Sequence, residues 1–185
     1  MSEQQPGKRR ATYQDVLDAP GHLVAEIVDG ELVLSPRPAA RHSTVTSALG
    51  GELLPPFGRG RGGPGGWIIL DEPELHLHED IVVPDLAGWR RERMPAVPDE
   101  AYFTLAPDWI CEVLSRSTEK LDRTRKLGIY ARAGVRHAWF VSPLWRTVEV
   151  MRLHEGHWLL VAVHATDERA RVEPFDAIEL DLGSL

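Results

Sequence analysis

Apolar residues fall into short runs separated by turn-forming residues, a pattern that predicts a chain rich in β-strands. The runs LVAEIV and ELVLS are joined by Asp29-Gly30, the sequence most typical of a two-residue β-hairpin turn. Between residues 42 and 54 the apolar positions recur at helical spacing, which predicts a helix. Further strands are predicted at 67–71, 73–78, 79–89, 107–115, 137–142, 147–153 and 157–164, and a short one at 178–182.

Capping signals predict two more helices. Thr12 followed by Asp15 has the pattern of a capping box, so a short helix should end near residue 18. After the strand at 107–115, serine and threonine residues can cap a helix that ends near residue 133, with Gly134 at its C-terminal cap. Glycine and proline make connectors of residues 58–66 and 90–106.

This order of elements predicts one α/β or α+β domain over residues 12–185, with a mixed central β-sheet flanked by helices and a disordered tail at 1–11. Hydrophobic residues make up 43% and charged residues 26% of the chain, as in an ordinary globular protein. No apolar run approaches the roughly 20 residues that span a membrane. The first residues do not resemble a secretion signal. The one cysteine, Cys111, excludes internal disulfides, so we expect a cytoplasmic protein with no membrane partner.

Carboxylates interrupt two of the predicted apolar strands. Glu112 lies in the middle of PDWICEVLS, and Asp85 directly follows the apolar run IVV and Pro84. A buried carboxylate costs several kcal/mol unless something pairs with it. A divalent cation shared by both side chains would offset both costs, and hard cations such as Mg²⁺ prefer carboxylate, water and phosphate oxygens.

The predicted helix after this strand carries a basic residue that could reach the same place. Asp122, Lys126 and Tyr130 stand four residues apart, so they share one helix face. One interpretation is a surface ion pair between Asp122 and Lys126. The other lays this face over the end of the strand, so that Lys126 meets Glu112 and orients an attacking water or stabilises charge on a phosphate.

The sequence VVPD, then EVLS-x-ST-x3-D-x3-K-x3-Y-x3-GV, then HAWFV, resembles the Uma-type family of restriction endonuclease domains. That family belongs to the PD-(D/E)xK nuclease superfamily, and the resemblance covers roughly residues 12 to 182. It implies a restriction-endonuclease-like fold with Mg²⁺ or Mn²⁺ bound by Asp85 and Glu112. The superfamily lysine stands two residues after the glutamate, where this chain has Leu114. The resemblance therefore implies that Lys126 is a catalytic lysine that has migrated to the helix.

The resemblance also implies a further acidic ligand or supporting group near the first hairpin. Glu26 and Glu31 are both candidates, and Glu26 is favoured because it interrupts an apolar strand as Glu112 does. Asp122 is expected to support the site or to be structural.

Several other residues admit both a functional and a structural interpretation. Arg59 and Arg61, in the glycine-rich connector, are candidates for contact with phosphate, although such arginines are more often solvated. His42 precedes the predicted helix and is expected to cap it or to lie at the surface. His76 and His78 alternate along a predicted strand, a spacing that could bind zinc but is more typical of a solvent-facing pair. Structural roles are expected for the remaining residues: Tyr130 and Cys111 in the core, Ser115 and Ser117 as helix caps, and Trp139, Trp145 and Trp158 as strand packing.

The leading hypothesis is thus a Mg²⁺- or Mn²⁺-dependent endonuclease that hydrolyses DNA phosphodiester bonds. The net charge of -7 and the leucine at 114 keep two alternatives open. One is a nuclease fold without catalysis that acts as a binding module, and the other is a metal-dependent hydrolase of a small phosphate ester. A homodimer is expected from the resemblance and from the apolar strands at 147–153 and 157–164, which could pair across a two-fold axis.

Overall fold

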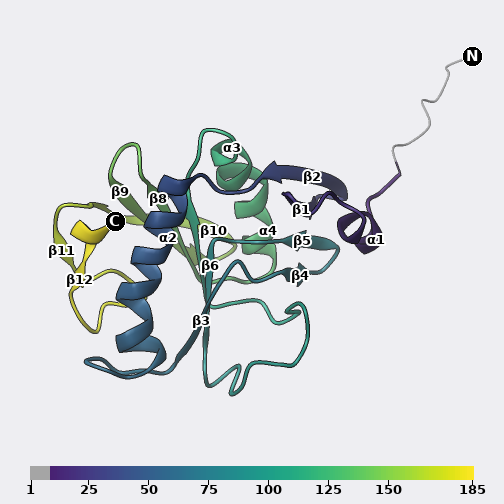
Figure 1. Ribbon diagram of the computed structural model, residues 1–185. Helices are drawn as coiled ribbons and strands as arrows, with labels where there is room; N and C mark the ends of the chain where they lie inside the picture. The colour runs from purple at the N-terminus through teal and green to yellow at the C-terminus, as the bar shows by residue number, and fades with distance from the viewer. Residues whose placement is uncertain (1–8) are drawn as a thin grey trace, which may run out of the picture.

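A six-stranded mixed sheet forms the centre of the computed structural model, which describes residues 9–185, Ser184 by its backbone alone (Figure 1). The strand order is β10-β9-β8-β7-β6-β3. Only β7 and β8 run parallel, because the helical segment between them carries the chain back across the sheet. The strands are β3 (Trp67–Asp71), β6 (Leu86–Arg90), β7 (Trp109–Val113), β8 (His137–Ser142), β9 (Thr147–His154) and β10 (His157–Ala165). The prediction of an α+β fold with a mixed central sheet is confirmed.

A second, four-stranded antiparallel sheet packs beside the first, in the order β2-β1-β5-β4. Its strands are β1 (Leu23–Val28), β2 (Glu31–Pro36), β4 (Leu75–Leu77) and β5 (Asp80–Val82). The predicted hairpin turn is confirmed: Asp29 and Gly30 have φ angles of 51° and 80°, as a turn matching the strand twist requires. A small third pair joins β11 (Arg169–Ala170) to β12 (Leu180–Asp181).

The helices lie on opposite faces of the six-stranded sheet. One face packs against α2 (Ala40–Leu53), which continues into a π-helical turn, η1 (Leu54–Gly58), and against residues near the C-terminus. The other face packs against a helical segment and the second sheet. That segment consists of α3 (Glu119–Leu121), a π-helical turn η2 (Asp122–Lys126) and α4 (Leu127–Arg132). The remaining short helices are α1 (Tyr13–Leu17) and η3 (Leu182–Ser184).

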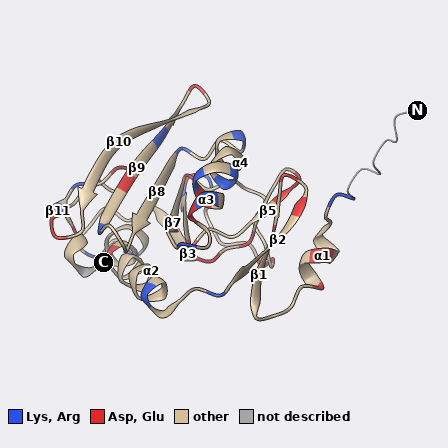
Figure 2. Cartoon of the chain, turned by 90° about the horizontal axis from the view of Figure 1, so that it is seen from above, with Lys and Arg blue, Asp and Glu red and all other residues tan. Residues whose placement is uncertain are grey.

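Ion pairs fix the helical segment against the second sheet. Basic positions along α3 to α4 lie beside acidic positions around the β1–β2 hairpin and β5 (Figure 2). Arg125 Nε lies 3.0 Å from Asp29 Oδ2, and Arg132 Nη2 lies 2.9 Å from Asp29 Oδ1 and 3.2 Å from Asp80 Oδ2. The Arg125 guanidinium is the main cause that holds the pKa of Asp29 below its usual range. Burial acts in the opposite direction, and Arg132 lowers the pKa further.

The predicted strand at 79–89 is wrong in one respect that matters for the site. Its two halves are β5 and β6, which belong to different sheets, and Pro84 and Asp85 lie at the crossing between them. Proline has no N–H to donate to a ladder, so a strand that continues through it loses a hydrogen bond. The crossing leaves the Asp85 carboxylate outside any strand.

Three other expectations need correction. Of the predicted tail, residues 1–8 lie outside the described residues, while the Ala11 N–H donates to the Gly30 carbonyl at 2.9 Å, so the tail is shorter than predicted. His78 lies in a turn with φ of 59°, so it does not share a strand face with His76. The helix predicted at 42–54 begins earlier, at Ala40, so His42 lies within its first turn and does not precede it. None of the helices among residues 9–185 is long and apolar enough to cross a membrane.

Candidate active site

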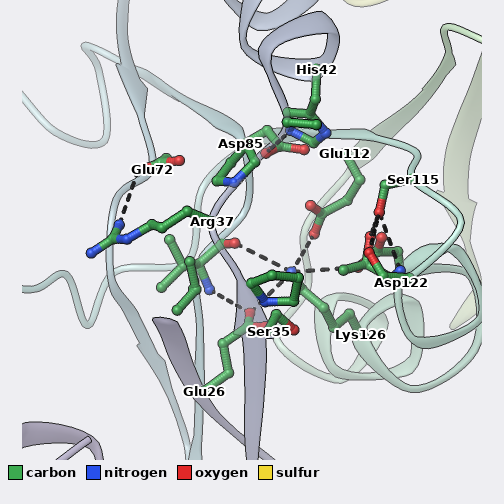
Figure 3. Close-up of a pocket in the computed structure, with 17 residues that line it drawn as sticks. Glu26, Ser35, Arg37, His42, Glu72, Asp85, Glu112, Ser115, Asp122 and Lys126 are labelled. Carbon is green, nitrogen blue, oxygen red and sulfur yellow. Dashed lines mark hydrogen bonds and ion pairs between the residues drawn. The ribbon is translucent and has the colours of Figure 1, made fainter. Parts of the chain in front are cut away.

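A cavity of about 320 Å³ opens where the two sheets, the first turn of α2 and the helical segment meet (Figure 3). Its wall includes Glu26 from β1, Asp85 from the crossing, Glu112 from β7, and Asp122 and Lys126 from η2. These residues are distant in sequence, and the folding of both sheets around the crossing at 83–85 brings them together.

Lys126 is the centre of this cluster. Its side chain is only 4% exposed, and its Nζ lies 2.9 Å from Glu112 Oε1, 3.0 Å from Glu26 Oε1 and 3.6 Å from Asp122 Oδ1. It also donates to the Val83 carbonyl at 3.2 Å. Burial works against the ammonium, but the surrounding carboxylates outweigh it and raise the pKa of Lys126 well above its usual value. The placement of Lys126 against Glu112 agrees with the interpretation that lays this helix face over the strand.

Glu112 is buried between Lys126 and Tyr130. The Tyr130 hydroxyl donates to Glu112 Oε1 at 2.6 Å, so Tyr130 is more than the packing residue it was expected to be. Burial raises the pKa of Glu112 well above its usual range; Lys126 opposes this rise, while the charges of Asp122 and Asp85 add to it. The contacts of Glu112 with Tyr130 and Lys126 are both made by Oε1, and Glu112 lines the cavity.

Asp85 is held on both sides by hydrogen bonds. The Val113 N–H donates to its Oδ2 at 2.6 Å, and His42 Nε2 donates to its Oδ1 at 2.6 Å. Burial lowers the pKa of His42, but the hydrogen bond and charge of Asp85 outweigh it, so the pKa is raised. Nδ1 of His42 is buried and has no partner among the described residues. His42 therefore belongs to the cluster, contrary to the expectation that it only caps a helix or lies at the surface.

Of the remaining candidate residues, some line the cavity and others lie outside it. Glu26 also accepts from the Val83 N–H at 2.9 Å and lines the cavity, whereas Glu31 lies outside it and pairs with Arg125 at 3.1 Å. Arg59 and Arg61 follow η1, at the far end of α2 from His42, and do not line the cavity. The arginine that does line it is Arg37, which sequence analysis missed because no local pattern marks it.

The donor set fits a divalent metal ion, although the described residues do not form a preassembled coordination site. No group of three or more His, Cys, Asp and Glu side chains in residues 9–185 is arranged to hold an ion. The carboxylates are instead drawn toward Lys126 and His42. Even so, three carboxylates surround Lys126 and Asp85 lines the same cavity. Burial with mutual repulsion raises the pKa of both Glu112 and Asp122. Oxygen donors with an excess of negative charge are what Mg²⁺ and Mn²⁺ prefer.

The mixed six-stranded sheet with helices on both faces, and acidic residues gathered at the crossing, define the restriction-endonuclease-like class of fold. The chain belongs to the Uma2 family, whose description is "Putative restriction endonuclease" and whose model matches residues 11–183. The recognition made from the sequence motifs is confirmed, and the family supports a nuclease function. Nucleases of this class generally use divalent metal ions.

A solved structure has the same fold over nearly its whole length. It is described as a putative nuclease belonging to DUF820 from Anabaena variabilis ATCC 29413. Its TM-score is 0.69 and its sequence identity 21%, and the match covers 94% of this chain and 96% of that chain. At this identity the likeness supports the fold alone. No curated protein matches the chain.

Proposed function

We propose that this protein is a Mg²⁺- or Mn²⁺-dependent endonuclease that hydrolyses DNA phosphodiester bonds. The observation that carries the proposal is the buried cluster in which Glu26, Glu112 and Asp122 surround Lys126, with Asp85 lining the same cavity. Such a cluster costs free energy to bury, and a functional role would explain why the fold keeps it. The family supports a nuclease as that use.

Asp85 and Glu112 would hold the ion, which supplies Lewis-acid activation of the phosphate and a bound water of lowered pKa. His42 orients Asp85 through its 2.6 Å hydrogen bond, and Tyr130 orients Glu112 in the same way. The Lys126 ammonium would position the attacking water or stabilise the negative charge that develops on the phosphate. Glu26 and Asp122 would keep Lys126 charged and in place.

Titration calorimetry with Mn²⁺ tests the metal site directly. We expect the wild type to bind Mn²⁺, and Glu112→Gln and Asp85→Asn to bind at least about tenfold more weakly, since each loses a charged ligand. Glu31→Gln is the matched control, because Glu31 is an acidic residue of the β1–β2 hairpin that lies outside the cavity. Circular dichroism checks that each variant is folded. A wild type that binds no Mn²⁺ at millimolar concentration would contradict the proposal.

Nicking of supercoiled plasmid DNA tests the reaction. Cleavage should require Mg²⁺ or Mn²⁺ and should be lost in Asp85→Asn and Glu112→Gln but retained in Glu31→Gln. Metal binding without cleavage of any nucleic acid would instead favour the binding module. Cleavage of a chromogenic phosphodiester but not of DNA, with little dependence on salt, would favour a hydrolase of small esters, because binding to a long polyanion weakens steeply with salt.

The homodimer expected from the sequence has a candidate surface in β10. This strand ends the six-stranded sheet, so its outer edge has no partner strand among the described residues. Leu159, Leu160, Val161 and Val163 of β10 are all exposed. An apolar edge strand of nine residues is a template for pairing with another chain. Light scattering should give the mass of a dimer, and Val161→Lys on β10 should convert it to a monomer; a monomeric wild type would refute this part of the proposal.

A further inference from the structure

Trp145 is the exposed exception among six tryptophans. Trp67, Trp89, Trp109 and Trp139 are buried and Trp158 is half-buried, but Trp145 is 74% exposed. The expectation that Trp145 packs against a strand is therefore wrong. Trp145 lies in the tight turn between β8 and β9, where its backbone N–H donates to Ser142 Oγ at 3.2 Å. The Trp145 ring is therefore exposed to solvent and has no role in the core.

The turn that carries Trp145 is anchored on both sides. Arg41 Nη2 from the first turn of α2 donates to the Pro143 carbonyl at 2.7 Å. The Thr166 N–H, just beyond β10, donates to the Arg146 carbonyl at 2.9 Å. These contacts fix the backbone of the turn that carries the indole, so less conformational entropy is lost when a ligand stacks on the ring.

A second cavity, of about 180 Å³, lies beside this ring and adjoins the candidate active site. The two cavities share Ala39, His42 and Ser115 in their walls. Trp145 and Leu144 also line the second cavity. Because β7 and β8 are parallel, the loops that follow them lie at the same edge of the sheet, where ligands of α/β folds bind. A polymer whose reacting group is at Asp85 can therefore extend from the first cavity into the second, which Trp145 lines.

Charge on the second cavity favours phosphate. Arg41 and Arg116 line it, against a single carboxylate, Glu119. Glu119 is already paired with Arg123 at 3.0 Å. Arg116 is exposed and has no hydrogen bond or ion pair within the described part of the chain. An unpaired guanidinium and an exposed indole in one cavity can together bind a nucleotide. The guanidinium pairs with the phosphate, and the indole stacks on the base.

We propose that this second cavity binds an unpaired nucleotide next to the scissile phosphate, with its base stacked on Trp145 and its phosphate paired with Arg116. The indole can stack only on a base whose face is free, and in a duplex both faces are covered by neighbouring base pairs. The substrate class is then single-stranded DNA, or DNA with an unpaired segment at the cut. This inference rests on the proposed nuclease function, since it names the substrate of that site.

Binding without metal tests the inference separately from catalysis. Fluorescence anisotropy in EDTA would compare a labelled oligothymidylate, the same strand in a duplex, and a strand of abasic sites. Trp145→Ala should weaken oligothymidylate binding at least about fivefold, the lower end of what removing a base–aromatic stack costs. Trp145→Phe should recover part of the loss. The abasic strand should bind Trp145→Ala and wild type equally.

Two matched controls separate stacking and pairing from general effects. Leu17, on α1, is an apolar residue that is 59% exposed and lies outside both cavities, so Leu17→Ala should bind as wild type does. Arg116→Ala should weaken binding of all three ligands. Arg169→Ala should change none of them, because Arg169 is an exposed arginine of β11 that lies outside both cavities.

Equal binding of oligothymidylate by wild type and Trp145→Ala would overturn the inference, as would an equal loss for duplex and single strand. Neither result touches the nuclease proposal if plasmid nicking still depends on metal, Asp85 and Glu112. Conversely, loss of single-strand binding in Trp145→Ala would support the inference even where nicking fails.

Discussion

Replacing Lys126 by methionine tests whether the buried carboxylates are charged in the folded protein. Methionine keeps most of the length of the lysine side chain and removes the ammonium, so packing is retained while Glu112, Glu26 and Asp122 lose the cation at 2.9, 3.0 and 3.6 Å. Removing one partner of a single buried ion pair typically costs about 3–5 kcal/mol, because it leaves an uncompensated buried charge. We expect a loss in this range near pH 8, a large part of the roughly 5–15 kcal/mol that stabilises a domain.

The cost should shrink in acid. The pKa of Glu112 is already raised by burial, and loss of Lys126 raises it further. A carboxyl group whose pKa is higher in the folded than in the unfolded protein favours folding at low pH, and this advantage is lost as the pH rises above the unfolded value of about 4.3. Protonation therefore relieves the variant near pH 5. The gap in unfolding free energy between wild type and variant should widen from pH 5 to pH 8.

Urea unfolding followed by tryptophan fluorescence, in EDTA, measures this gap at each pH. Lys120→Met is the control, because Lys120 is exposed on the same helical segment and its replacement should change stability by less than about 0.5 kcal/mol. A Lys126→Met protein as stable as wild type at pH 8 would refute the reasoning. An equal loss at both pH values would also refute it, since that pattern would indicate a packing defect rather than charge.

Three further predictions concern the surroundings of the cluster. Tyr130→Phe should lower the free energy of unfolding by about 1–3 kcal/mol in urea, because Glu112 Oε1 loses the 2.6 Å bond from the hydroxyl; no change would contradict the geometry. Gly134→Ala should lower thermal stability by about 1–2 kcal/mol, because its φ of 78° strains any side chain even though there is room for one. Cys111 should be inert to thiol reagents until urea unfolds the protein, because burial raises the pKa of its thiol; labelling of the native protein at the unfolded rate would disprove this.

Local signals predicted the elements that depend on a few adjacent residues. Asp29-Gly30 identified the first hairpin, and Gly134 identified the end of the helical segment, because a positive φ can be recognised from the residue types that tolerate it. The spacing of Asp122, Lys126 and Tyr130 predicted a shared face, and all three side chains do turn to Glu112 or Lys126.

Contacts between distant segments could not be predicted in this way. His42 and Asp85 are 43 residues apart, and nothing in the helix around His42 indicates that its first turn meets the crossing between the sheets. The crossing itself was hidden because IVV and LAGW both have the composition of strands, and only Pro84 marked a break. Trp145 was misjudged because a tryptophan between two strands is usually buried, whereas its exposure depends on a three-dimensional turn.

The position of the lysine follows from how the two sheets meet. Leu114 stands where the superfamily motif has its lysine, and it lines the second cavity beside Arg116, not the first. From η2, by contrast, Lys126 reaches Glu26 of the small sheet, Glu112 of the large sheet and the Val83 carbonyl between them. One ammonium thereby joins both sheets at the site that it is proposed to serve. Its loss should therefore reduce activity and stability together, so the kinetics of Lys126 variants have meaning only where the fraction of folded protein is measured beside them.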